Sequence, residues 1–101
     1  MHRVLVVEDD GVSRKGLSDL MRAWGFEVES AASAEEARDR VATWMPAVVV
    51  TDLMMPGMDG LELLSALKRD CPSAVVILLT AHATIETAVR AMKDGALDYL
   101  T

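Results

Sequence analysis

The chain of 101 residues contains one cysteine, three prolines and few aromatic side chains, which make up 4% of the sequence. The single cysteine, Cys71, excludes a disulfide within the chain, is compatible with a reducing compartment, and is most simply a residue late in a helix. Lysine and arginine number 10 against 16 aspartates and glutamates, which gives a net charge of −6. Because neutralising nucleic-acid phosphates requires clustered basic side chains, this balance argues against direct nucleic-acid binding.

Long hydrophobic runs are also absent. No apolar run approaches the roughly 20 residues of a membrane-spanning helix, and charged residues follow Val7 at once, so the N-terminus lacks a signal-peptide pattern. Apolar residues nevertheless make up 51% of the chain, enough to build a hydrophobic core. These features predict one domain over residues 1–101 that lies in the cytoplasm and makes no membrane contact.

Short apolar runs alternate strictly with helical patterns along the chain. We predict strands at residues 3–7, 26–31, 47–51, 74–80 and 98–101. Helices are expected at residues 12–24 and after N-caps at Ser33, Asp59 and Thr84. This alternation, with short connections, predicts an α/β fold in which a parallel sheet has helices on both faces. The polar strand 26–31 is expected at an edge, and the most apolar strand, 74–80, is expected to be central.

Helical periodicity predicts which side of the first helix is buried, and Gly25 is expected to end that helix. The residues predicted to face the core are Val12, Leu17, Leu20, Met21 and Trp24. The second helix is expected to bury Ala34, Ala37, Val41 and Trp44.

Polar side chains stand where the predicted strands end. Glu8 and Asp9 follow the first strand, Asp52 follows the third, and Thr80 ends the fourth. In open α/β sheets the functional edge is the one where parallel strands end. If the first and third strands are neighbours, three carboxylates share one crevice, and their repulsion is relieved by a hard divalent cation. We therefore predict a Mg²⁺ site there.

A metal ion at this edge brings phosphate chemistry within reach, because it neutralises charge on a transferring phosphoryl group. A carboxylate can itself accept the phosphoryl group, which makes Asp52 the candidate reactive residue, with Thr80 as a hydrogen-bond donor. N-capping explains Asp10 and Asp59 fully. His82 is interpreted as a solvated loop residue. The side chains of the methionines at 54, 55 and 58 are interpreted as packing under the loop rather than as metal ligands.

Four segments of the chain resemble the receiver domain of bacterial two-component response regulators. The segments are Val-Leu-Val-Val-Glu-Asp-Asp at 4–10, Thr-Asp-Leu-Met-Met-Pro-Gly-Met-Asp-Gly at 51–60, Leu-Leu-Thr-Ala-His-Ala at 78–83, and Gly-Ala-Leu-Asp-Tyr-Leu at 95–100. The resemblance spans the whole chain. It implies a flavodoxin-like three-layer sandwich with a five-stranded parallel sheet of order 2-1-3-4-5, which places the first and third strands side by side.

The resemblance also implies roles for individual residues. Asp52 matches the aspartate that a sensor histidine kinase phosphorylates, and Glu8 and Asp9 match the acidic pair that holds Mg²⁺ with it. Met54 matches the position that gives a backbone carbonyl to the metal.

Two further positions match the switch of the family. Thr80 matches the hydroxyl that moves onto the phosphoryl group, and Tyr99 matches the aromatic residue that turns inward with it. The family carries a lysine and a last helix after the fifth strand, where this sequence ends at Thr101. We therefore expect either a chain that is cut before them or a fragment of a longer regulator. Without the last helix, an apolar face near the first helix should lie bare and cause self-association, as in a homodimer, or poor solubility.

The sequence around Thr80 and Tyr99 is most similar to receivers of nitrogen-regulator-like, enhancer-binding transcription activators, whose output is an ATPase and a DNA-binding domain. The resemblance implies a phosphoacceptor switch that assists its own phosphorylation and dephosphorylation and is not an enzyme. The alternative is a receiver-like interaction module that is never phosphorylated. An aspartyl-phosphate phosphatase would require a general acid where Met54 stands.

Overall fold

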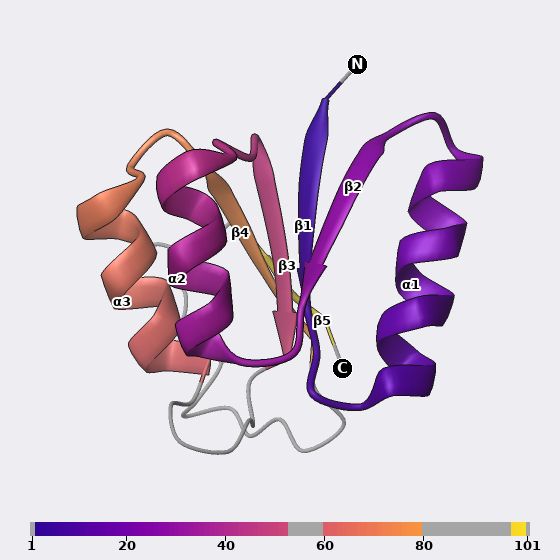
Figure 1. The fold of residues 1–101 in the computed structure, drawn as a ribbon. Coiled ribbons are helices and arrows are strands. Elements are labelled where there is room, and N and C mark those ends of the chain that lie inside the picture. The colour runs from indigo at the N-terminus through magenta and orange to yellow at the C-terminus, as the bar shows by residue number, and fades with distance from the viewer. Residues whose placement is uncertain (1, 53–59, 80–97, 101) are drawn as a thin grey trace.

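The computed structural model describes residues 2–52, 60–79 and 98–100, and the side chains of residues 2–52 and 62–78. From residue 3 to residue 79, strands and helices alternate as the sequence pattern predicts (Figure 1). The elements are β1 (Arg3–Val7), α1 (Gly11–Ala23), β2 (Glu27–Ala31), α2 (Ala34–Thr43), β3 (Val48–Asp52), α3 (Gly60–Asp70), β4 (Val75–Leu79) and β5 (Asp98–Leu100). The predicted helix after Thr84 lies outside the described residues.

All five strands pair in parallel, in the order β2-β1-β3-β4-β5. In register, Val7 of β1 lies opposite Ala31 of β2 and Thr51 of β3. The flavodoxin-like sheet order is therefore confirmed, with β2 at an edge as predicted. The apolar strand β4 lies inside the sheet between β3 and β5, whereas β3 holds the central position.

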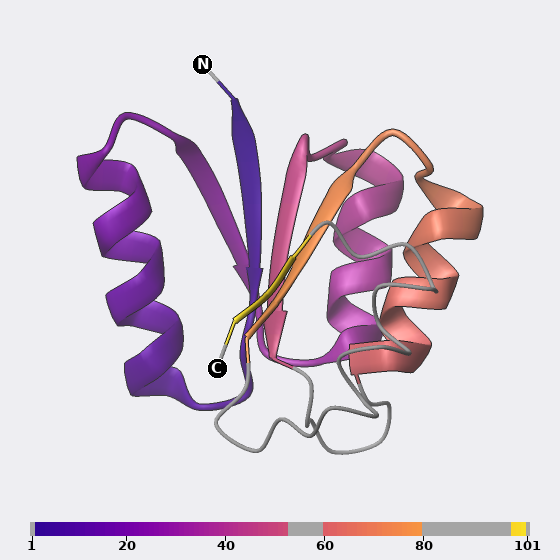
Figure 2. The ribbon, with the colours of Figure 1, turned by 180° about the vertical axis from the view of Figure 1, so that it is seen from behind.

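Helices cover the sheet from both sides. In both views α1 lies on one side of the sheet, and α2 and α3 lie together on the other (Figures 1 and 2). The side chains of β1 alternate between the two faces, and all four from Val4 to Val7 are buried. This two-sided burial is why β1 is a continuous apolar run, since parallel strands are covered on both faces.

Two hydrophobic clusters separate along these faces. The larger lies under α2 and α3 and includes Leu5, Val49, Leu64, Leu67 and Leu78. The smaller lies under α1 and joins Val4, Val6, Val28 and Val50 to the partly buried Leu17, Met21 and Phe26. Full burial of each such side chain contributes about 1.5–3 kcal/mol.

The predicted buried face of α1 is wrong for three residues. Val12, Leu20 and Trp24 are 83%, 46% and 66% exposed, whereas Leu17 and Met21 pack against the smaller cluster. At about 100° per residue, Val12 lies on the opposite side of the helix from Met21. The five apolar residues therefore span more of the helix circumference than one sheet face can cover.

Local hydrogen bonds define the ends of α1. Asp10 Oδ2 accepts from the backbone N–H of Ser13 at 3.0 Å and from its hydroxyl at 2.7 Å, which confirms Asp10 as an N-cap. At the other end, Gly25 adopts a φ of 95°, and Phe26 N–H donates to the Met21 carbonyl. The Gly25 N–H donates to the backbone carbonyl of Arg22, and the two hydrogen bonds together form a Schellman motif.

The second predicted cap is also confirmed. Ser33 Oγ accepts from the Glu36 N–H at 3.1 Å, and Glu36 Oε2 accepts from the Ala32 N–H at 3.2 Å, one residue before the usual capping-box donor. The predicted inward residues of α2 are buried, and Trp44 packs against the larger cluster.

Cys71 directly follows α3 and is buried in the larger cluster, one residue beyond the helical position that we expected. No helix in the described part of the chain combines the length and apolarity that crossing a membrane requires.

Candidate functional site

Three carboxylates meet at the edge of the sheet where β1 and β3 end. Each of Glu8, Asp9 and Asp52 offers a carboxylate oxygen, and these oxygens lie within 4.8 Å of one another. The pairing of β1 with β3 causes this meeting, because Val7 and Thr51, the residues before Glu8 and Asp52, are partners in the register. The predicted cluster is thus present, with Glu8 and Asp52 partly buried and Asp9 exposed. We refer to these three residues as the acid cluster.

The pKa of Glu8 is raised by its surroundings in the acid cluster. The pKa of the Glu8 carboxyl is raised from 4.5 to about 7, mainly by burial and in smaller part by the neighbouring Asp9 and Asp52, against the lowering effect of the Asp10 N–H. Desolvation and nearby like charge both disfavour the ionised form. Glu8 therefore keeps its proton to a higher pH than a solvent-exposed glutamate does.

The chemistry of this donor set suits a hard divalent cation. Three carboxylates converge on a small volume, and Mg²⁺ takes carboxylate oxygens together with water and phosphate oxygens. The raised pKa of Glu8 fits this assignment, because a cation would favour its ionised form.

The loop that carries Glu8 and Asp9 is held by hydrogen bonds on several sides. The Glu8 N–H donates to the Ala31 carbonyl at 3.1 Å, and the Asp10 N–H donates to Glu8 Oε1 at 3.1 Å. From α1, Arg14 Nη1 donates to the carbonyl of Glu8 at 3.0 Å and to that of Asp9 at 3.5 Å. The carboxylates of Glu8 and Asp9 therefore project from a loop that β2 and α1 hold in place.

Two of the supporting residues were missed by the sequence analysis. Arg14 lies on the side of α1 that also carries Leu17 and Met21, so a basic residue among inward positions was the available signal. Thr51 is fully buried, and its hydroxyl donates to the Asp52 carbonyl at 3.1 Å. A hydroxyl residue within an apolar strand was the signal there.

The remaining predicted site residues are only partly covered by the structure. Met54, Thr80 and His82 lie outside the described residues. Tyr99 belongs to β5 and lies opposite Leu78 of β4 in the register, although its side chain is outside the described set. The acid cluster is therefore the part of the predicted site that the structure brings together.

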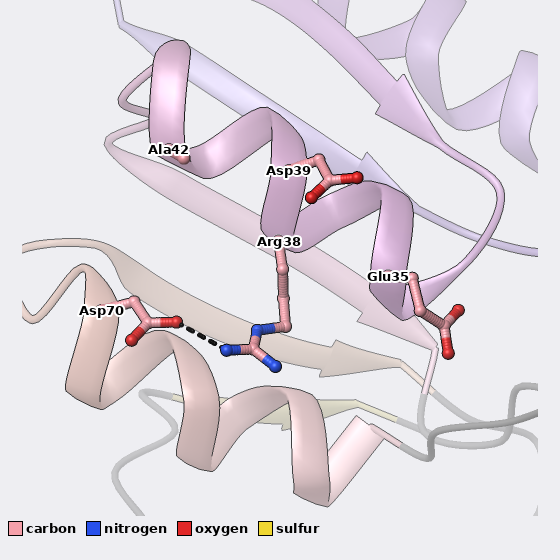
Figure 3. A pocket seen from close by; sticks show the side chains of 5 residues that line it. All are labelled: Glu35, Arg38, Asp39, Ala42 and Asp70. Carbon is pink, nitrogen blue, oxygen red and sulfur yellow. Dashed lines mark hydrogen bonds and ion pairs between the residues drawn. The ribbon is translucent and has the colours of Figure 1, made fainter.

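A separate groove lies between α2 and α3 and shares no residue with the acid cluster (Figure 3). Its volume is about 410 Å³, and its lining consists of Glu35, Arg38, Asp39, Ala42 and Asp70. Arg38 donates to Asp70 at 3.1 Å, and this hydrogen bond holds the pKa of the Asp70 carboxyl below its usual value. The ion pair joins the two helices.

Together these observations define an α/β protein of the flavodoxin-like class with an acidic edge, at the ends of β1 and β3, whose donor set suits a divalent cation. A comparison with protein families then assigns the chain more narrowly. The profile of the response regulator receiver domain matches residues 4–101, and the chain belongs to this family.

Curated relatives agree with this assignment. The response regulator protein FleR of Pseudomonas aeruginosa is 42% identical over 98 residues, which cover 97% of this chain and 21% of FleR. The DNA-binding transcriptional regulator NtrC of Klebsiella pneumoniae is 39% identical over 95 residues, which cover 94% of this chain and 20% of NtrC. The chain thus spans about a fifth of the length of these relatives.

Solved structures share the fold. A response regulator from Burkholderia pseudomallei, solved with a phosphorylated aspartic acid, calcium ion and citrate, superposes with a TM-score of 0.93 at 32% identity, over 99% of this chain and 59% of that one. The beryllofluoride-activated NtrC4 receiver domain dimer superposes with a TM-score of 0.92 at 35% identity, over 99% of this chain and 83% of that one. As a response regulator receiver, the chain is a phosphorelay signalling domain, whose general kind is a signal switch rather than a catalyst.

Proposed function

We propose that this chain accepts a phosphoryl group on Asp52 from a sensor histidine kinase and so controls an output domain. The observation that carries this proposal is the meeting of Glu8, Asp9 and Asp52 within 4.8 Å at the ends of β1 and β3. A phosphorylated aspartic acid in the similar Burkholderia pseudomallei structure supports it.

Each residue of the site then has a chemical role. A carboxylate oxygen of Asp52 attacks the phosphorus atom, the bond between phosphorus and the kinase imidazole nitrogen breaks, and its electron pair remains on that nitrogen. Glu8, Asp9 and Asp52, with the backbone carbonyl of Met54, would hold Mg²⁺, which offsets negative charge on the transferring group. The chain assists this transfer and the later hydrolysis of its own phosphate, without acting as a turnover enzyme.

The output follows from a change between two states. In this proposal the hydroxyl of Thr80 moves onto the phosphoryl group and Tyr99 turns inward, which alters the surface that contacts an output domain. The relative NtrC is a DNA-binding transcriptional regulator, which supports an output that includes a DNA-binding domain. We propose that an ATPase accompanies it, as the resemblance to enhancer-binding activators implies, and that the protein acts in the cytoplasm. Residues 1–101 would form the receiver of that longer protein.

A second copy of this chain is the further partner that we propose. The NtrC4 receiver, which superposes on this chain, is described as a dimer. Rotational correlation times measured by NMR at rising protein concentration test this, and a value that stays that of a monomer contradicts it.

Phosphorylation by a small-molecule donor tests the proposal directly. Phosphoramidate with Mg²⁺ should add one phosphoryl group to the chain, as read from the intact mass, and either Asp52→Asn or chelation of Mg²⁺ should abolish the addition. Asp39→Asn serves as the matched control, because Asp39 is an exposed carboxylate of α2 outside the acid cluster. Undiminished labelling of Asp52→Asn would contradict the assignment, and no labelling of the unchanged chain would favour the interaction module.

A further inference from the structure

Arg14 reaches back from the first turn of α1 to the loop that carries the acid cluster. Its Nη1 donates to the carbonyl oxygens of Glu8, at 3.0 Å, and Asp9, at 3.5 Å. These carbonyls belong to the peptide groups on either side of the Asp9 Cα atom. Because two peptide planes share each Cα, holding both planes restricts the backbone dihedral angles at Asp9 and therefore the direction of its carboxylate.

We propose that Arg14 is a positioning residue of the metal site, which acts through the main chain of Glu8 and Asp9. The proposal rests on the proposed function in one respect, namely that the acid cluster binds Mg²⁺. Two other hydrogen bonds act on neighbouring groups of the loop: the Glu8 N–H donates to Ala31, and the Asp10 N–H, in the peptide group of the Asp9 carbonyl, donates to the Glu8 carboxylate. Arg14 adds a side chain that contacts the carbonyls on both sides of Asp9.

Charge and positioning predict opposite effects of removing Arg14. A guanidinium beside the site repels a cation, so if its charge alone mattered, its loss would tighten Mg²⁺ binding. If Arg14 orients the loop, its loss weakens binding, because a misdirected carboxylate is a poorer ligand. Loss of a supporting partner of a metal ligand typically reduces metal affinity about 10–100-fold.

Arg22 provides a matched control on the same helix. Its Nη2 donates to the Val28 carbonyl at 3.2 Å, so it makes the same kind of contact between a guanidinium and the main chain. That contact joins α1 to β2 and involves no residue of the acid cluster. Arg22→Gln therefore removes an equivalent hydrogen bond and an equal charge without touching the loop.

The experiment measures Mg²⁺ dissociation constants by calorimetry for the unchanged chain, Arg14→Gln, Arg14→Lys and Arg22→Gln. We expect Arg14→Gln to weaken binding about tenfold, Arg22→Gln to leave it unchanged, and Arg14→Lys to recover part of the loss through a remaining donor to Glu8. Equal or tighter binding by Arg14→Gln overturns the proposal, as does an equal loss in Arg22→Gln. If Arg14→Gln does not fold, Arg14→Lys is tested instead. Its Mg²⁺ affinity should still be weaker than that of the unchanged chain, because lysine is expected to reach only one of the two carbonyls.

A measurement without metal tests whether Arg14 orients the backbone of Glu8 and Asp9. The ¹³C chemical shifts of the Glu8 and Asp9 carbonyls should change in both Arg14 variants and stay constant in Arg22→Gln. Unchanged carbonyl shifts in Arg14→Gln overturn the proposal even if its affinity falls. Failure of the proposed function shows separately, as absence of Mg²⁺ binding in the unchanged chain.

Discussion

Glu8 shows how its place in the acid cluster changes the ionisation of a carboxyl group. Its pKa rises from 4.5 to about 7 because the carboxyl is partly buried and faces Asp9 and Asp52. Strand pairing brings the three carboxyl groups together, and repulsion between their negative charges destabilises the metal-free protein. Cation binding and proton binding are therefore alternative ways to relieve the same charge.

This competition predicts a pH-dependent stability. A carboxyl whose pKa is raised in the folded state binds its proton more tightly there than in the unfolded chain. In EDTA, the free energy of unfolding should therefore fall as pH rises from 4.5 to about 7. Urea unfolding measured across this pH range tests the prediction. Saturating Mg²⁺ should reduce the decrease in the free energy of unfolding, because the cation binds the ionised carboxylate.

Two variants isolate the contribution of Glu8. Glu8→Gln should remove part of the decline, whereas Glu35→Gln, at an exposed position of α2, should leave it unchanged. An identical decline in Glu8→Gln and the unchanged chain would show that the titration belongs to other groups.

At this scale, the sequence was sufficient to predict the acidic residues of the site. It did not predict the residues that hydrogen-bond to the backbone around them. Glu8, Asp9 and Asp52 could be predicted because each stands at a strand end, and parallel strand ends share an edge. Arg14 and Thr51 could not, because they act on backbone carbonyls of the loop and strand. Such contacts depend on the path of the chain and leave no spacing pattern between side chains.

Among the elements, α1 has its start and its end fixed by local capping interactions. Asp10 caps its first turn through Ser13, and Gly25 ends it with a φ of 95°. An L-residue with a side chain is strained in this left-handed region. The turn after α1 directs Phe26 and β2 back toward β1, so the geometry of Gly25 helps to set the edge of the sheet.

The two glycines of this region should respond oppositely to alanine. Gly25→Ala should destabilise the protein by about 1–2 kcal/mol, because of its positive φ. Gly16→Ala should stabilise it by about 0.5–1 kcal/mol, because Gly16 lies in the interior of α1 with open space around an added Cβ. Thermal unfolding of both variants measures this, and a destabilised Gly16→Ala or a neutral Gly25→Ala would contradict it.

The ends of elements were better predicted than the faces of α1. Caps depend on residues close in sequence, and those at Asp10, Ser33 and Gly25 are all observed. The exposure of Val12 and Trp24 depends instead on how α1 lies on the sheet, which periodicity alone does not determine. Helix rotation is set by packing against β1 and β2.

At the scale of the whole molecule, the strand order is what creates the site. β1 and β3 are far apart in sequence but adjacent in the sheet, so the loop after β1 and the last residue of β3 contribute to one edge. Strict alternation of strands and helices predicts a parallel sheet, and the resemblance to receivers supplied the order, which the structure confirms. We expect the response to phosphorylation to involve Thr80 and the side chain of Tyr99, and both roles stay predictions.

The most direct test of the account follows backbone amide chemical shifts on addition of Mg²⁺ and beryllium fluoride, which mimics a phosphoryl group. Mg²⁺ alone should shift amides of the acid cluster, whereas further shifts there and at Tyr99 in β5 should require both reagents. These shifts should vanish in Asp52→Asn and persist in Asp39→Asn. Equal shifts in Asp52→Asn, or none in the unchanged chain, would contradict a Mg²⁺-dependent phosphoryl acceptor at the ends of β1 and β3.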